Sequence, residues 1–76
     1  MIRVNIISDN KQITENFYNI KQVFDYLVFD LKIKANDDCA VLGKKILDLN
    51  VGSATKYDSY TFACAGKTRV GNHLRF

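Results

Sequence analysis

The chain has 76 residues, of which 47% are hydrophobic and 25% are charged, and it carries a formal net charge of +3. This length predicts one domain over residues 1–76, with little room for a deep, enclosed active site beside its core. The composition excludes a disordered tail. No run of about 20 apolar residues is present, so we expect a cytoplasmic protein with no membrane partner.

A β-strand is predicted over residues 2–7, where β-branched residues alternate with Arg3 and Asn5. A long amphipathic helix is predicted from Ile13 to Leu31, with Asp9 as its N-cap. The residues that share its core-facing stripe are Ile13, Phe17, Ile20, Phe24, Leu27 and Leu31, with Val28 at the edge.

The segment after the first strand also permits a second interpretation. Asp9 and Asn10 would form a hairpin turn, and residues 11–13 would pair back on the first strand. Thr14 would then cap a shorter helix that begins at Glu15. We favour the long helix because Ile13 lies on its apolar stripe.

Residues 39–51 give an ambiguous pattern after the helix ends near residues 32–35. Apolar and polar residues alternate over residues 46–51, which predicts a strand there. Alternatively, Asp37 or Asp38 caps a second helix that runs to Leu49. We adopt the strand, and residues 39–45 stay open between helix and strand.

The last third of the chain predicts a loop over residues 52–59 and then a β-hairpin. Its strands would be residues 60–65 and 68–76, joined by a turn at Gly66 and Lys67. The predicted order is therefore β-α-β-β-β. The fold class is α+β, a two-layer single domain with one long amphipathic helix packed on an antiparallel or mixed sheet of about four strands.

A row of basic side chains is the most organised polar feature. Residues 44–76 carry a net charge of +4, against −1 for residues 1–43. On the last predicted strand, side chains of one face alternate with those of the other. The residues of the basic face are Lys67, Arg69, His73 and Arg75. Such a row suits a phosphate backbone or an acidic protein groove, and the alternative is an ordinary solvated sheet face.

Apolar bulk on the back of the long helix is the second feature. A helix that lies on a sheet is normally polar on its outer side, so either a second element covers this face or it binds a partner or a second copy of the chain. Tyrosine and phenylalanine are also residue types that anchor interfaces. The residues concerned are Tyr18, Tyr26, Phe29 and Ile33.

Motifs for catalysis, metal binding or a cofactor are weak. Ala65-Gly66-Lys67-Thr68 resembles the end of a phosphate-binding P-loop, but Thr61 occupies the position of the required first glycine. The two cysteines, Cys39 and Cys64, lack metal-ligand spacing and are expected to be reduced and at least partly buried. Cys64 and His73 are a formal nucleophile and base, yet Cys64 has the setting of a core thiol. We expect no enzyme activity, no metal and no cofactor.

The leading hypothesis is a small non-catalytic protein that docks on a protein or nucleoprotein partner and blocks it. Small single domains of this composition look like those that phages and mobile elements encode, anti-CRISPR proteins among them, and such a protein would act in the host cytosol. This likeness is one of kind and rests on no motif. The alternatives are a sequence-nonspecific nucleic-acid-binding module and, least favoured, a small hydrolase or nuclease. A homodimer is also compatible with the sequence.

Overall fold

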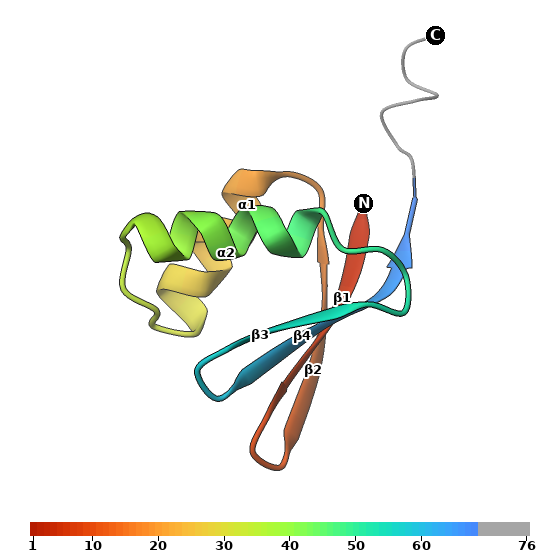
Figure 1. Cartoon of the computed structure of the whole chain (residues 1–76), viewed down its shortest axis with the longest axis horizontal. Helices are drawn as coiled ribbons and strands as arrows, with labels where there is room; N and C mark the ends of the chain where they lie inside the picture. Colours follow the sequence, from red (N-terminus) through yellow and green to blue (C-terminus); the bar gives the residue numbers. More distant parts are fainter. Residues whose placement is uncertain (69–76) are drawn as a thin grey trace, which may run out of the picture.

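The computed structural model describes residues 1–68, which form a four-stranded antiparallel sheet with helices on one face (Figure 1). The predicted α+β class is confirmed, but the element order is β-β-α-α-β-β rather than β-α-β-β-β. The elements are β1 (Ile2–Ser8), β2 (Lys11–Phe17), α1 (Ile20–Asp25), the π-helix η1 (Tyr26–Asp30), α2 (Asp37–Leu47), β3 (Ala54–Tyr57) and β4 (Tyr60–Lys67). The strand order β2-β1-β4-β3 joins two hairpins along β1 and β4.

The predicted long helix is wrong over its first third, because Lys11–Phe17 is strand β2. This strand pairs with β1 without a break, from Ser8 opposite Lys11 to Ile2 opposite Phe17. Asp9 begins the turn with a φ of 50°, a conformation typical of tight hairpin turns. The hairpin interpretation is right about the turn, although the strand is longer than residues 11–13 and the helix begins later.

The helical segment that follows is short and changes geometry at its middle. The Asn19 side chain caps α1 by accepting a hydrogen bond of 2.9 Å from the backbone N–H of Gln22. From Tyr26 the helix widens to π geometry, and the backbone N–H of Leu31 donates to the Tyr26 carbonyl at 3.1 Å. Lys32, with a φ of 60°, ends the segment. The predicted end near residues 32–35 is therefore close to the observed one.

The prediction of a strand over residues 46–51 is wrong, because residues 46 and 47 end helix α2 (Asp37–Leu47) and residues 48–51 form no strand. Asn36 caps α2, accepting a hydrogen bond of 3.1 Å from the backbone N–H of Cys39. Its buried residues follow the helical spacing of three, four and seven: Cys39, Leu42, Gly43 and Ile46. The alternative interpretation as a helix is therefore right, with Asn36 rather than an aspartate as the cap.

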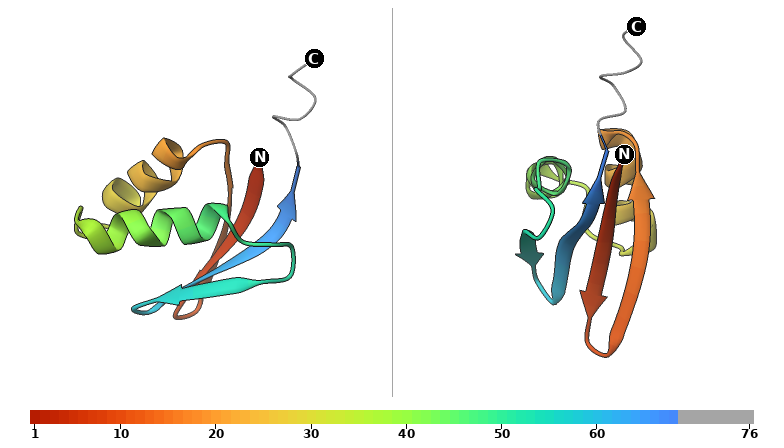
Figure 2. Two further views of the ribbon diagram at one scale, coloured as in Figure 1. Left: turned by 45° about the horizontal axis from the view of Figure 1, so that its top comes forward. Right: turned by 90° about the vertical axis from the view of Figure 1, so that its right-hand side faces the viewer.

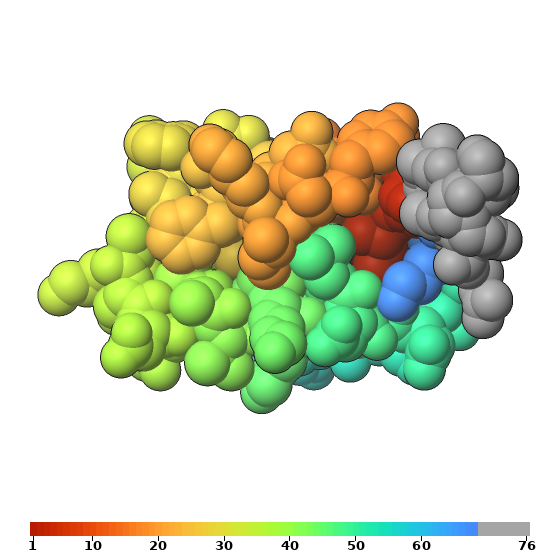
Figure 3. Space-filling model, turned by 90° about the horizontal axis from the view of Figure 1, so that it is seen from above, coloured from red at the N-terminus to blue at the C-terminus, as the bar shows by residue number. Residues whose placement is uncertain are grey.

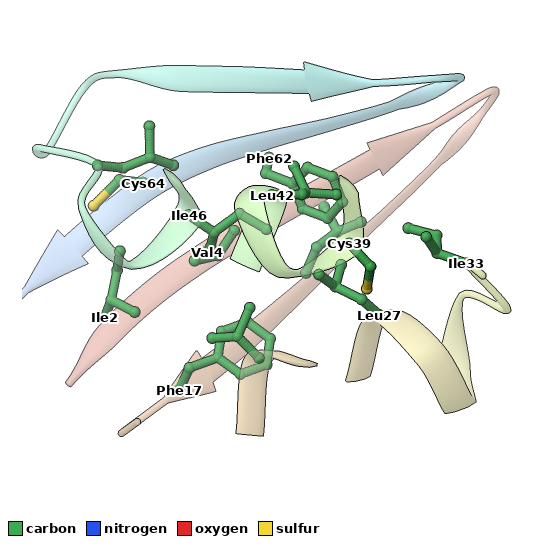
Figure 4. Close-up of a cluster of buried hydrophobic side chains, with 13 residues drawn as sticks. Ile2, Val4, Phe17, Leu27, Ile33, Cys39, Leu42, Ile46, Phe62 and Cys64 are labelled. Atoms are coloured by element: carbon green, nitrogen blue, oxygen red, sulfur yellow. The ribbon is translucent and has the colours of Figure 1, made fainter. Parts of the chain in front are cut away.

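The two helical segments lie next to each other on one face of the sheet (Figure 2, left), and their atoms form adjoining bands when the molecule is seen from above (Figure 3). The helices meet at Gly43, where a Cβ atom would lie 3.4 Å from Cδ1 of Ile20 and 3.7 Å from Cγ1 of Val23, at ordinary van der Waals distance. The core between helices and sheet contains Val4, Phe62 and Leu27 among its fully buried side chains (Figure 4).

The second hairpin differs from its prediction at both ends. Strand β3 lies within the predicted loop of residues 52–59, and the turn is at Asp58 and Ser59. Gly66 and Lys67 continue β4, so the predicted turn there is wrong. Thr68 follows the strand and donates its backbone N–H to the Met1 carbonyl at 2.8 Å. The rest of the predicted return strand, residues 69–76, lies outside the described residues.

Candidate interaction surface

The outer side of α1 and η1 carries the aromatic residues that the sequence marks as a contact surface. Tyr18 is 63% exposed and Phe29 is 66% exposed, fractions unusual for side chains of this size. Tyr26 is half-buried and packs edge-on against Phe17, with ring centroids 5.5 Å apart. Ile33 is only 9% exposed and belongs to the core, so it cannot contribute to a contact surface as predicted.

Local hydrogen bonds hold the start of this surface in place. The backbone N–H of Tyr18 donates to Oε1 of Gln22 at 2.6 Å, while Gln22 donates its own N–H to Asn19. This reciprocal arrangement resembles a capping box, which fixes the angle at which the chain enters a helix. The backbone at Tyr18 is therefore tied to the first turn of α1.

A shallow hollow of about 330 Å³ lies between the end of β2 and the outer side of the helical segment. Its apolar wall is formed by Phe17, Tyr26 and Phe29. Three carboxylates also line it, Glu15 from β2, Asp25 from α1 and Asp30 from η1. Lys21 offsets one of them, because its Nζ lies 2.9 Å from Oδ2 of Asp25 in an exposed i, i+4 ion pair.

The pKa of Tyr26 reflects the burial and the negative charge of this hollow. Burial raises the pKa of its phenol, and the negative charges of Glu15 and Asp30 raise that pKa further. A site that opposes the ionisation of a phenol also opposes the approach of other anions. The surroundings of the aromatic surface are therefore acidic, although the chain as a whole is basic.

A second hollow of about 430 Å³ lies near the β1–β2 turn. Ile6 and Ile13 line it from the strands, and Leu31 and Tyr60 line it from the end of η1 and the start of β4. Ile13, expected on the core stripe of a helix, is instead 47% exposed on β2. It is an apolar side chain at the edge of the sheet.

The predicted basic row is represented in the described residues by Lys67 alone, since Arg69, His73 and Arg75 lie outside them. A register shift between β1 and β4 leaves Ala65 unopposed and sets Lys67 opposite Ile2, which faces the core. Lys67 consequently reaches the helical side, where its Nζ donates to the Leu49 carbonyl at 2.9 Å. This contact stabilises the chain just beyond the end of α2, and the phosphate-binding role of the row stays a prediction.

The described residues leave the Cys64 and His73 pair untested, because His73 lies outside them. Cys39 and Cys64 are free and buried, as predicted, and burial raises the pKa of the Cys39 thiol. In this part of the chain no three His, Cys, Asp or Glu side chains are placed to hold a metal ion. The P-loop resemblance fails structurally, because Gly66 and Lys67 lie in a strand. None of the helices within residues 1–68 is both long and apolar enough to cross a membrane.

Comparison of this chain with protein-family models, with curated proteins and with solved structures found no match.

Sequence reasoning missed the carboxylates of the aromatic surface. Asp25 and Asp30 flank Tyr26 and Phe29 in the sequence FDYLVFD. Their position beside the aromatic residues could therefore have been predicted from helical spacing. Glu15 gave no such signal, because it comes from a strand and meets the helical segment only in the folded chain.

Proposed function

We propose that this chain is a non-catalytic binding protein that docks on a macromolecular partner through the aromatic surface, defined as Tyr18, Tyr26 and Phe29 with the neighbouring Glu15, Asp25 and Asp30. The observation that carries the proposal is the exposure of Tyr18, which lies just before α1, and of Phe29, which lies on η1. Exposed aromatic side chains of this kind act as anchors that lose their water on binding.

The charges around Tyr18, Tyr26 and Phe29 favour a partner of one chemical kind. Glu15, Asp25 and Asp30 line the hollow beside Tyr26 and Phe29, so the aromatic surface favours cationic groups. We therefore propose a protein or nucleoprotein partner whose contact region is rich in arginine or lysine. Arginine suits this surface well, because it pairs with carboxylates and stacks on aromatic rings.

A protein that binds in this way would act by covering a surface of its partner. A chain of 76 residues has little volume for an enclosed catalytic pocket, and the hollow beside the aromatic surface is open. A partner surface that the protein covers is lost to its other ligands. The proposal therefore retains the blocking role and the phage or mobile-element setting suggested by the sequence, and both rest on the sequence alone.

The experiment is a capture assay with the full chain immobilised, followed by affinity measurement on the captured partner once it is purified. Phe29→Ala and Tyr18→Ala should each weaken binding by about tenfold or more, the loss typical of anchor residues. Val51→Ala is the matched control, because Val51 is 62% exposed and lies outside the aromatic surface. A partner that binds the two aromatic variants as tightly as the unaltered chain contradicts the proposal.

A nucleic-acid-binding module is the second candidate. The sheet face that the helices leave bare carries Arg3 and Lys56, and the strand residues on that face within residues 1–68 include no carboxylate. Binding to labelled DNA or RNA that falls steeply between about 50 and 200 mM salt would favour it. Loss of that binding on charge reversal at Arg69 and Arg75, with Phe29→Ala unaffected, would replace the first proposal by this one.

A further inference from the structure

Strand β2 is an open edge of the sheet with little protection against strand pairing. It has seven residues, most of them exposed, and within residues 1–68 it is the last strand on its side of the sheet (Figure 2, right). Edge strands are usually shielded by proline, a bulge, short length or charged side chains, and of these β2 has only the charges of Lys11 and Glu15. The chain contains no proline, β2 pairs with β1 without a register shift, and the opposite edge strand β3 has only four residues.

The two-residue turn determines which backbone groups of β2 are free. In such a hairpin the closing pair, Ser8 and Lys11, is the hydrogen-bonded kind, and the two kinds of pair alternate from there. Gln12, Thr14 and Asn16 therefore direct their peptide groups away from β1. A second β2 strand that approaches antiparallel must set even-numbered residues opposite even-numbered ones.

Side-chain chemistry selects one register among those allowed. With Ile13 opposite Ile13 of a second copy, Lys11 lies opposite Glu15 of that copy, and the same charge pair occurs twice across the two-fold axis. With Thr14 at the axis, Glu15 would instead lie opposite an isoleucine and Lys11 opposite a phenylalanine. Only the register centred on Ile13 satisfies both charges.

We propose that two copies of this chain pair antiparallel along β2, with Ile13 at the two-fold axis, and so join two four-stranded sheets into one. Lys11, Ile13 and Glu15 all lie on the face of β2 that is toward the helices, as their opposition to Ser8, Ile6 and Val4 shows. The two Ile13 side chains meet beside the hollow lined by Leu31 and Tyr60. The pairing thus covers an apolar side chain that is 47% exposed in the single chain.

The experiment measures the mass of the full chain in solution, by sedimentation or light scattering, over about 10 to 500 µM, a range chosen for an interface of modest size. The expected mass rises from the 8.7 kDa of one chain towards twice that value. Lys11→Glu sets two carboxylates opposite each other at both ends of the interface. It should raise the dissociation constant of the dimer about tenfold or more.

The decisive variant combines Lys11→Glu with Glu15→Lys. This exchange restores opposite charges in the register centred on Ile13 and in no register centred on a neighbouring residue, so the dimer should return. Lys56→Glu is the control, because it makes the same change of net charge on the other edge strand and should leave the mass unchanged. A single-chain mass at every concentration overturns the proposal, and so does a dimer that Lys11→Glu leaves intact. Circular dichroism of each variant establishes that it is folded.

Discussion

The two faces of the sheet are built from alternate residues of the same strands, yet they have different roles. On the helical side, Ile2, Val4 and Ile6 of β1 meet Phe62 and Cys64 of β4, and all five are buried. On the bare side, Arg3 and Asn5 lie between them and are tied by side-chain hydrogen bonds to Asn16 and Thr14 of β2. One face therefore holds the domain together, while the other is free to vary in chemistry.

The aromatic surface belongs to neither face. Its aromatic residues lie on the outer side of the layer that covers the buried face, where a helix needs no apolar residue for folding. Tyr18 and Phe29 are thus large apolar side chains that the core does not use. This difference is the physical reason for assigning the binding role to the helical segment rather than to the sheet.

The largest expected difference between the two faces is in how far a substitution lowers the free energy of unfolding. Phe62 is among the largest fully buried side chains, so Phe62→Ala should lower the free energy of unfolding by about 3–5 kcal/mol through lost burial and a new cavity. Ile7→Thr on the bare face should cost less than about 1 kcal/mol, since Ile7 is 37% exposed and both residues favour strands. Urea denaturation followed by circular dichroism measures both. Equal losses would refute the division of roles between the faces.

A smaller contrast is expected between two lysines of the sheet. Lys67→Met removes the hydrogen bond from Nζ to the Leu49 carbonyl beyond the end of α2, and should destabilise the protein by about 1 kcal/mol. Lys56→Met, on the bare face of β3, should change stability by less than about 0.5 kcal/mol. The same denaturation experiment compares them, and an unchanged midpoint for Lys67→Met would show that the contact adds nothing.

The smallest expected effect is on the titration of Tyr26, which lies at the edge of the helical layer. Its pKa lies above the ordinary 10.0, because burial and the charges of Glu15 and Asp30 disfavour the phenolate. The folded state therefore holds this proton more tightly than the unfolded state, and the corresponding stability is present below pH 10 and is lost as the pH rises through the raised pKa. Absorbance titration of tyrosinate should show one late component that Tyr26→Phe removes.

The contribution of Glu15 can be separated in the same titration. Glu15→Gln should move the late component towards pH 10, because one of the negative charges acting on the phenol is lost. Asp37→Asn, on the first turn of α2, is the matched control and should leave that component in place. A late component that Glu15→Gln leaves in place would exclude Glu15 as a cause of the raised pKa.

Residues with a single compatible periodicity were predictable from the sequence. Ile2, Val4 and Ile6 alternate strictly and form the first strand, and Phe62 and Cys64 form a buried strand in the same way. The free, buried state of both cysteines also followed from their spacing and neighbours. For these segments local pattern and tertiary environment favour the same structure.

Where the sequence pattern fits two structures, only tertiary packing chose between them. Ile13 and Phe17 are four residues apart, a spacing that puts two side chains on one face of a helix and equally of a strand. Pairing of β2 with β1 decided for the strand, because its seven residues pair with β1 in one continuous register and every second residue exchanges backbone hydrogen bonds with that strand. The alternation over residues 46–51 had no such partner, and the buried spacing of Cys39, Leu42 and Ile46 against α1 produced a helix instead.

The aromatic surface likewise has features that the sequence predicts and features that only the tertiary structure decides. The aromatic character of Tyr18, Tyr26 and Phe29 was visible in the sequence, since it depends only on residue type and helical spacing. The burial of Ile33 and the arrival of Glu15 beside Tyr26 depend on how a strand and a helical segment pack together. Residue chemistry is a local property, whereas burial and the electrostatic field at a side chain are set by segments distant in the chain.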